Sequence, residues 1–226
     1  MDEQLEPFFR VLDSITRIAA VAQRQLDFEL ATGFSATKLL RPDERQLSDT
    51  FACLLDPAEA HGQGGLFLGQ FIEMFGISGV PTDRALCHVA REKGRIDILV
   101  EIGSIAPFAI GIENKPWAGD RANQVRCYCH HLAKYFPERW WFGYLSGTGS
   151  HPPDHSIEPQ MRMGLEAKGR FRTIPFARLG DNSEVSIEDW LMRCAEVCRA
   201  ERVRWFLRDL LDYVASNFSE EATGHD

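Results

Sequence analysis

Two neighbouring segments, GRIDILVEIG (residues 94–103) and FAIGIENK (residues 108–115), have the alternating apolar pattern of β-strands and decide the predicted fold. Side chains two residues apart along a strand point to the same face of the sheet. The isoleucines of the second segment therefore share one face, while Glu113 and Lys115 share the other. Two charged residues at a strand end are either a solvated ion pair, which contributes little to stability, or part of a functional site.

The turn between these segments predicts an antiparallel hairpin centred on Ile105. In that register residue 102 pairs with residue 108, and Asp97 lies directly opposite Glu113. Directly opposed residues have Cβ atoms about 4.5 to 5.5 Å apart, so the two carboxylates would share one pocket. Like charges at this distance destabilise a sheet unless a positive charge lies between them.

Three arrangements would relieve this repulsion. Lys115 alone could neutralise the acids, or a register shifted by two residues could separate them. A divalent cation could also bind between them, and oxygen ligands suit Mg²⁺ or Mn²⁺ better than zinc. Glu44 is a third acid, near the start of a predicted helix, where it either interacts with the helix dipole or points into a cleft. With this third acid available, we favour the metal site.

The rest of the chain alternates helical and strand patterns, read from apolar spacing and turn residues. Asp120 is predicted to cap its helix, and residues 147–170 to form a long polar connection. Pro175 marks the last strand as an edge strand, because proline cannot donate to a ladder. The predicted helices are residues 4–30, 42–56, 66–75, 120–136, 186–198 and 201–218, and the predicted strands are 85–91, 95–102, 108–115, 139–147 and 170–176.

This order of elements predicts an α/β fold in which helices flank a central mixed sheet. The length of the chain suits one sizeable core, so one domain is the default. We expect a single domain over residues 1–226, with an N-terminal helical part (1–80), a core (81–147) and C-terminal helices (186–218).

Composition is that of a soluble globular protein, with 226 residues of which 44% are hydrophobic and 26% charged. No apolar run approaches the roughly 18 to 20 residues of a membrane span, and the acidic N-terminus is unlike a secretory signal, so we expect a cytoplasmic protein without membrane contact. The net charge of −8 argues against a surface that binds nucleic acid everywhere. Basic residues between Arg84 and Arg126 flank the acidic pair, either as a rim for nucleic acid or as a scattered, solvated set.

Cysteines and tryptophans are interpreted as structural. The six cysteines have no framework spacing and are expected to be reduced thiols. Cys127 and His131 lie four residues apart, yet the remaining ligands of a zinc site have no evident source. Trp117, Trp140 and Trp141 could stack on bases, but tryptophans within or beside buried strands are more often core residues.

The motif Ile96-Asp97, followed by Glu113-Asn114-Lys115 on the next predicted strand, resembles that of the PD-(D/E)XK nuclease superfamily, which has a restriction-endonuclease-like fold. The superfamily often has proline before the aspartate, where this chain has isoleucine, a substitution that is frequent among such proteins. Gln124 and Tyr128 resemble the Gln-x-x-x-Tyr element of its exonuclease-like branches. The chain is most similar to a bacterial family within this superfamily, and the similarity includes LSDTFACLLDPAEAHGQG (47–64) and WLMRC (190–194).

The resemblance implies a three-layer α/β sandwich with a central mixed β-sheet flanked by helices. It also implies Mg²⁺ (or Mn²⁺) bound by Asp97, Glu113 and Glu44, with the backbone carbonyl of Asn114 as a further ligand. A bound metal ion lowers the pKa of a water molecule and withdraws charge from a phosphodiester.

Catalytic roles are implied for two further side chains. Lys115 would orient the attacking water and stabilise the charge that builds on the phosphate. Gln124 would position a water or a phosphate from the flanking helix, and Tyr128 is a weaker candidate for the same task.

The resemblance therefore predicts a metal-dependent nuclease that hydrolyses phosphodiester bonds, in DNA above all, in bacterial defence, repair or mobile-element biology. A protein partner or a second copy of the chain would help such a small nuclease to find its target. The alternative is a catalytically silent nuclease-like domain that serves as a nucleic-acid or protein-binding subunit. A metal phosphohydrolase acting on nucleotides is a third interpretation.

Overall fold

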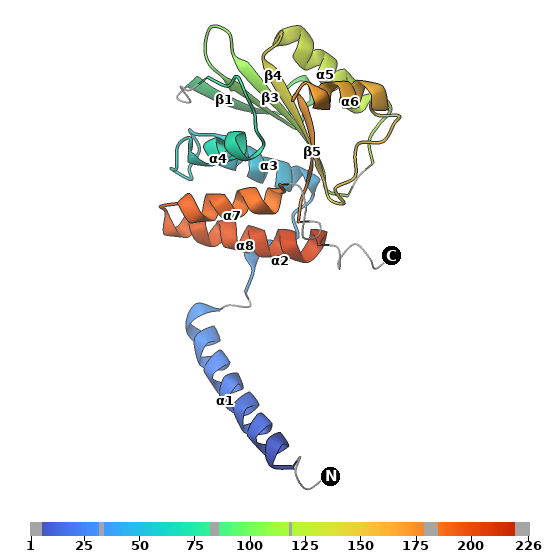
Figure 1. Ribbon diagram of the computed structural model, residues 1–226. Helices are drawn as coiled ribbons and strands as arrows, with labels where there is room; N and C mark the ends of the chain where they lie inside the picture. Colours follow the sequence, from blue (N-terminus) through green and yellow to red (C-terminus); the bar gives the residue numbers. More distant parts are fainter. Residues whose placement is uncertain (1–5, 32–33, 82–85, 118, 179–184, 220–226) are drawn as a thin grey trace. The chain divides into compact units, whose positions relative to one another are not determined.

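The computed structural model describes residues 6–31, 34–81, 86–117, 119–178 and 185–219 (Figure 1). The chain folds as two compact units, Met1–Ala36 and Thr37–Asp226. The first unit contains helix α1 (Glu6–Leu30), which confirms the helix predicted over residues 4–30. That both units belong to one domain over residues 1–226 stays a prediction.

A mixed sheet forms the centre of the second unit (Figure 1). Antiparallel pairing joins β1 to β2 and β2 to β3, whereas β3, β4 and β5 are parallel. The predicted hairpin register is confirmed, because Ile102 pairs with Phe108 and Ile98 pairs with Ile112. Among the described residues the strand order is β1 (Cys87–Arg91), β2 (Ile98–Ile102), β3 (Phe108–Lys115), β4 (Trp140–Ser146) and β5 (Phe171–Pro175).

Helices cover both faces of the sheet, and the three-layer α/β sandwich is thereby confirmed (Figure 1). The isoleucine face of β3 belongs to one apolar core with residues of α3, α4, α7 and α8. The opposite face of the sheet packs against α5 and α6 in a second core. The helices that follow α1 are α2 (Ala36–Leu40), α3 (Glu44–Leu55), α4 (Leu66–Met74), α5 (Gln124–Tyr135), α6 (Pro159–Ala167), α7 (Ile187–Val197) and α8 (Glu201–Phe218).

Three local predictions were wrong. Strand β2 begins at Ile98 rather than residue 95, because Lys93–Arg95 form a 3-10 turn in which Gly94 and Arg95 have positive φ. Helix α5 begins at Gln124, because Asn123 has a left-handed conformation and Asp120 accepts a hydrogen bond from Tyr144 instead of capping the helix. The connection over residues 147–170 contains helix α6, which starts at a proline, a residue favoured in the first turn of a helix.

Helix starts in this unit follow the side-chain chemistry of the sequence. Ser186 and Asp189 form a capping box at the start of α7, since each residue's side chain accepts a hydrogen bond from the backbone N–H of the other. Asp43 and Gln46 form a second reciprocal box at the start of α3. Within the described residues, none of the helices combines the length and the apolar character needed to cross a membrane.

Replacing Asp189 with alanine is expected to lower the free energy of unfolding at neutral pH by about 1 kcal/mol, the usual contribution of a helix cap. Burial raises the pKa of Asp189, but hydrogen bonds from Arg178 and Ser186 outweigh it, so the pKa lies below its ordinary value of 3.8. A group whose pKa is lowered by folding stabilises the protein above its unfolded pKa, and the contribution disappears as the pH falls. Urea unfolding should therefore separate the two proteins at pH 7 and not at pH 2, and equal loss at both pH values would contradict this cause.

Candidate active site

The β2–β3 hairpin brings Asp97 beside Glu113. Asp97 lies one residue beyond the last ladder pair, Ile98 with Ile112, so the hairpin register places it opposite Glu113. Oδ2 of Asp97 accepts a hydrogen bond from the backbone N–H of Asn114 at 2.9 Å. The guanidinium of Arg91 on β1 donates to the backbone carbonyl of Asp97. The acid is thus held by backbone and side-chain bonds from both neighbouring strands.

Lys115 connects two of the predicted acids. Its Nζ lies 2.6 Å from Oε1 of Glu44 on α3 and 3.0 Å from Oε1 of Glu113 on β3. The side chains of Lys115 and Glu113 are both buried, whereas that of Glu44 is 31% exposed. Removing one partner of a buried ion pair destabilises a protein, because the other charge is then left uncompensated.

The start of helix α3 is fixed to the end of β3 by Asn114. Nδ2 of this fully buried side chain donates to the backbone carbonyl of Glu44 at 3.1 Å and to Oγ of Ser48 at 2.9 Å. Ser48 in turn donates to the same carbonyl at 2.8 Å. These bonds place the Glu44 carboxylate above the end of β3, where it meets Lys115. The middle residue of the Glu-Asn-Lys motif therefore holds Glu44 through its side chain and Asp97 through its backbone N–H.

Gln124 is the first residue of α5 and reaches the same site. Its Nε2 donates to Oε1 of Glu113, while its Oε1 accepts from the backbone N–H of Arg121 at 2.8 Å. Tyr128, four residues later, is buried in the core with its ring 6.4 Å from that of Phe142. Burial, followed by the charge of Glu113, raises the pKa of Tyr128 to about 12, so this side chain stays neutral.

The charges of the site are strongly coupled. Burial raises the pKa of Glu113 to about 8, assisted by the charge of Asp97 and opposed by that of Lys115. Burial also raises the pKa of Asp97, although the Asn114 N–H and Lys115 act against it. For Lys115, burial lowers the pKa, but Glu113 and Glu44 outweigh this and raise it above its ordinary value of 10.5. The single positive charge of Lys115 is therefore not enough to bring the pKa values of Asp97 and Glu113 down to their ordinary range.

This donor set fits a divalent cation. Oε2 of Glu113 is buried and has no hydrogen-bond partner among the described residues, although Oε1 has two. Among all residues that the structure describes, no group of three or more His, Cys, Asp or Glu side chains is arranged so that it could hold a metal ion. The ligands would thus be Asp97, Glu113 and a backbone carbonyl such as that of Asn114, with water. The role of Glu44 as a third ligand stays a prediction, because its carboxylate is bound to Lys115.

Three neighbours of the site were missed by sequence reasoning. Ser48 and Arg91 position Glu44 and Asp97, and the sequence assigned neither of them a role in the site. Tyr144 pairs with Glu113 in the parallel β3–β4 register, and its hydroxyl donates to Asp120 at 3.0 Å. The alternation of side chains along β4 shows which face Tyr144 occupies. Placing it beside Glu113 also requires the register between β3 and β4, which the sequence does not provide.

The basic residues around the motif are mostly paired. Arg91 bonds Asp49 at 2.6 Å, and Lys93 bonds Glu101 at 2.6 Å. Arg126 likewise pairs with an acid, Glu158, at 2.7 Å, while Arg95 and Arg121 are exposed. Arg84 lies outside the described residues. A continuous basic rim therefore stays a prediction.

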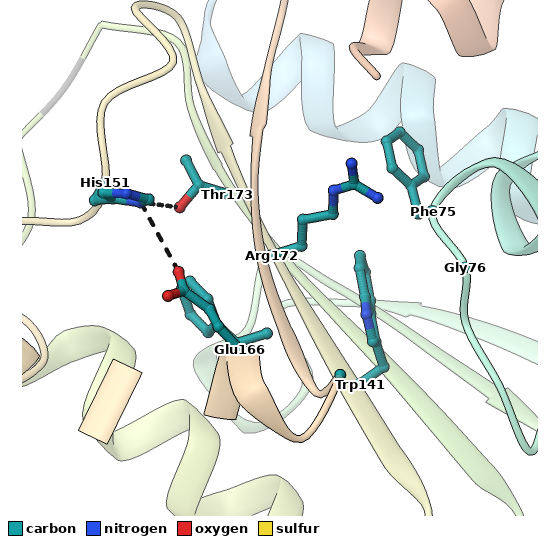
Figure 2. Close-up of a pocket in the computed structure, with 9 residues that line it drawn as sticks. Phe75, Gly76, Trp141, His151, Glu166, Arg172 and Thr173 are labelled. Atoms are coloured by element: carbon teal, nitrogen blue, oxygen red, sulfur yellow. Dashed lines mark hydrogen bonds and ion pairs between the residues drawn. The ribbon is translucent and has the colours of Figure 1, made fainter. Parts of the chain in front are cut away.

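A cavity of about 520 Å³ lies elsewhere, along β5 (Figure 2). The Arg172 side chain extends between β5 and the rings of Phe75 and Trp141, and His151 bonds Thr173 on the other side of the strand. None of the predicted catalytic acids lines this cavity. The predicted site is instead a group of charged residues where the end of β3 meets the start of α3.

Comparison with known proteins agrees with the geometry. The family model of the PD-(D/E)XK nuclease superfamily matches residues 34–220, so the chain belongs to this superfamily. No curated protein and no solved structure gives a significant match. The matched range begins after helix α1 and includes the whole described sheet and the acids around Lys115.

Replacing Gly147 with alanine is expected to displace the end of β3 and to lower the melting temperature. The N–H of Gly147 donates to the carbonyl of Lys115 at 3.2 Å, and a Cβ there would lie 2.0 Å from the carbonyl oxygen of Pro116. Overpacking of this kind costs about 1–3 kcal/mol. Gly164→Ala is the matched control, because nothing lies within 4 Å of a Cβ at that helical position. Thermal unfolding at the wild-type temperature in Gly147→Ala would contradict the contact.

Proposed function

We propose that this member of the superfamily is a metal-dependent nuclease that hydrolyses phosphodiester bonds, in DNA above all. The observation that carries the proposal is the position of Lys115, whose Nζ lies within 3.0 Å of Glu113 while Asp97 stands across the hairpin. We further propose that the protein acts in the bacterial cytoplasm, in defence, repair or mobile-element biology.

The cation, Mg²⁺ or Mn²⁺, would be held by Asp97, Glu113 and the Asn114 carbonyl. When bound, it supplies positive charge that acidifies a water molecule and withdraws charge from the phosphodiester. Gln124 and Lys115 both hold Oε1 of Glu113, which leaves the buried Oε2 free as a ligand.

Lys115 acts as a fixed positive charge. Because Glu113 and Glu44 raise its pKa, the amine stays protonated at neutral pH and does not serve as a base. Its role is then to orient the attacking water and to stabilise the additional charge on the phosphate oxygens, where preorganised donors have their largest effect. Glu44 supports this role by fixing Nζ at 2.6 Å.

Incubation with linear, circular and single-stranded DNA and with RNA, in Mg²⁺, Mn²⁺ or EDTA, tests the proposal. We expect cleavage with either metal, none in EDTA, and a fall on the order of a hundredfold or more in Asp97→Asn. Asp154→Asn is the control, since this aspartate is exposed on a loop and has no role in the site. Retained binding without cleavage of any substrate would instead support a catalytically silent, binding subunit.

A further inference from the structure

Trp117 is the exposed aromatic residue closest in sequence to Lys115. Its side chain is 55% exposed, whereas those of Trp140 and Trp141 are 4% and 3% exposed. The interpretation of all three as core residues is therefore confirmed for the two residues of β4 and wrong for Trp117. The reason is that Trp117 follows the end of β3, outside both apolar cores.

The exposed ring is held in place. Pro116 is buried. Its carbonyl lies so close to Gly147 that residue 147 has no room for a side chain. Beyond this constriction, the Trp117 ring lies against Phe218 at the end of α8, with centroids 5.5 Å apart and planes inclined at 31°. Phe218 itself is almost completely buried. The indole is therefore a supported platform rather than a free side chain.

The platform lies next to the predicted catalytic lysine. Consecutive Cα atoms are about 3.8 Å apart, so the Cα atoms of Lys115 and Trp117 are separated by at most about 7.6 Å. A phosphate at Lys115 and a base at Trp117 could thus belong to the same or to adjacent nucleotides. Arg121 adds an exposed positive charge on the same loop, which suits a strand whose backbone is negatively charged.

We propose, on the basis of the function proposed above, that Trp117 stacks on a base beside the phosphate that Lys115 contacts. Bases inside a duplex already stack on each other and cannot cover an aromatic side chain. The substrate is therefore single-stranded nucleic acid, or the unpaired end of a duplex. Stacking on an aromatic platform is tolerant of sequence, because every base has a π-face.

Tryptophan fluorescence in EDTA, where cleavage is prevented, tests this contact directly. Of the tryptophans, Trp140, Trp141 and Trp190 are buried, and only Trp117 and Trp205 are exposed among the described residues, at 55% and 52%. We expect short oligothymidylate to quench the emission of the wild type and of Trp205→Phe, and to leave that of Trp117→Phe nearly unchanged. Oligouridylate, measured in parallel, distinguishes DNA from RNA as the preferred strand.

Affinity provides the second readout. Trp117→Ala should bind the oligothymidylate roughly five- to a hundredfold more weakly, and Trp117→Phe should keep most of the affinity because it retains a ring. Binding to a duplex whose two ends are closed by hairpin loops of non-nucleotide linker should be weak and equal in all variants. Trp205→Phe again serves as the matched control.

Any of three results would overturn the inference. Quenching could persist in Trp117→Phe, quenching could be absent in the wild type, or Trp117→Ala could bind the single strand as tightly as the wild type. These outcomes are distinct from failure of the proposed function. If no substrate is cut but quenching through Trp117 is found, catalysis fails and the contact stands. If metal-dependent cleavage is found and the Trp117 variants bind and cut like the wild type, the nuclease stands and the contact fails.

Discussion

Lys115→Met is expected to reduce the rate of phosphodiester cleavage by about a hundred- to a thousandfold, the usual effect of removing one preorganised electrostatic contact. Methionine keeps the length of the side chain but removes the charge that lies 2.6 Å from Glu44 and 3.0 Å from Glu113. Single-turnover cleavage at saturating DNA measures the effect on the chemical step separately from binding.

The fold should survive this substitution for an electrostatic reason. Burial and Asp97 already raise the pKa of Glu113 to about 8, so its carboxyl can take up a proton when Lys115 is lost. Circular dichroism provides the check on folding. Lys93→Met is the matched control, because Lys93 forms an ion pair of the same length with Glu101 away from the site. Wild-type cleavage by Lys115→Met would remove the central residue from the proposed mechanism.

Glu113→Gln is expected to abolish both cleavage and stabilisation by Mg²⁺. The substitution alters the side chain that carries one of the two buried carboxylate oxygens without a hydrogen-bond partner among the described residues, the other being Oδ1 of Asp120. A ligand present at a hundred times its dissociation constant stabilises a protein by about 2.7 kcal/mol, and this gain should be absent from the variant. Thermal unfolding with and without MgCl₂ measures it, and Glu101→Gln on β2 is the matched control.

The same variant should be more stable than the wild type in EDTA at high pH. Folding raises the pKa of Glu113 from 4.5 to about 8, so the folded protein keeps a proton that the unfolded chain releases. Stability from this group is therefore present below pH 4.5 and is lost as the pH rises through about 8. Glutamine does not titrate, so the stability of the variant relative to the wild type should rise between pH 4.5 and about 8 and be greatest at pH 9. A metal-free wild type that is more stable than Glu113→Gln at pH 9 would show that Lys115 fully compensates the carboxylate.

The strand pattern and the hairpin register could be predicted because both are local properties. Alternation of apolar residues fixes which side chains share a face, and a short turn fixes which residues oppose each other. The proximity of Asp97, Glu113 and Lys115 could be predicted from these two properties, because the three residues lie on one hairpin. The capping box at Ser186 was predictable for the same reason, because a helix start is determined by neighbouring residues.

Several local predictions failed where a distant residue decided the outcome. Asp120, in the loop before α5, does not cap that helix, because its carboxylate accepts a hydrogen bond from the hydroxyl of Tyr144 on β4. Trp117 is not a core residue, because it is supported by Phe218 at the far end of the sequence and remains exposed. In both cases the local pattern was compatible with either outcome.

The sequence by itself determined the order of the elements, the pairing of the two central strands and the set of charged residues at their ends. Only the tertiary structure decided that Asn114 fixes α3 to β3, that Glu44 reaches Lys115, and that Gln124 holds Glu113. These contacts join residues up to 71 positions apart. Their geometry depends on how helices pack on the sheet, and that packing is set by the summed burial of many apolar side chains rather than by any pattern local to the residues that meet.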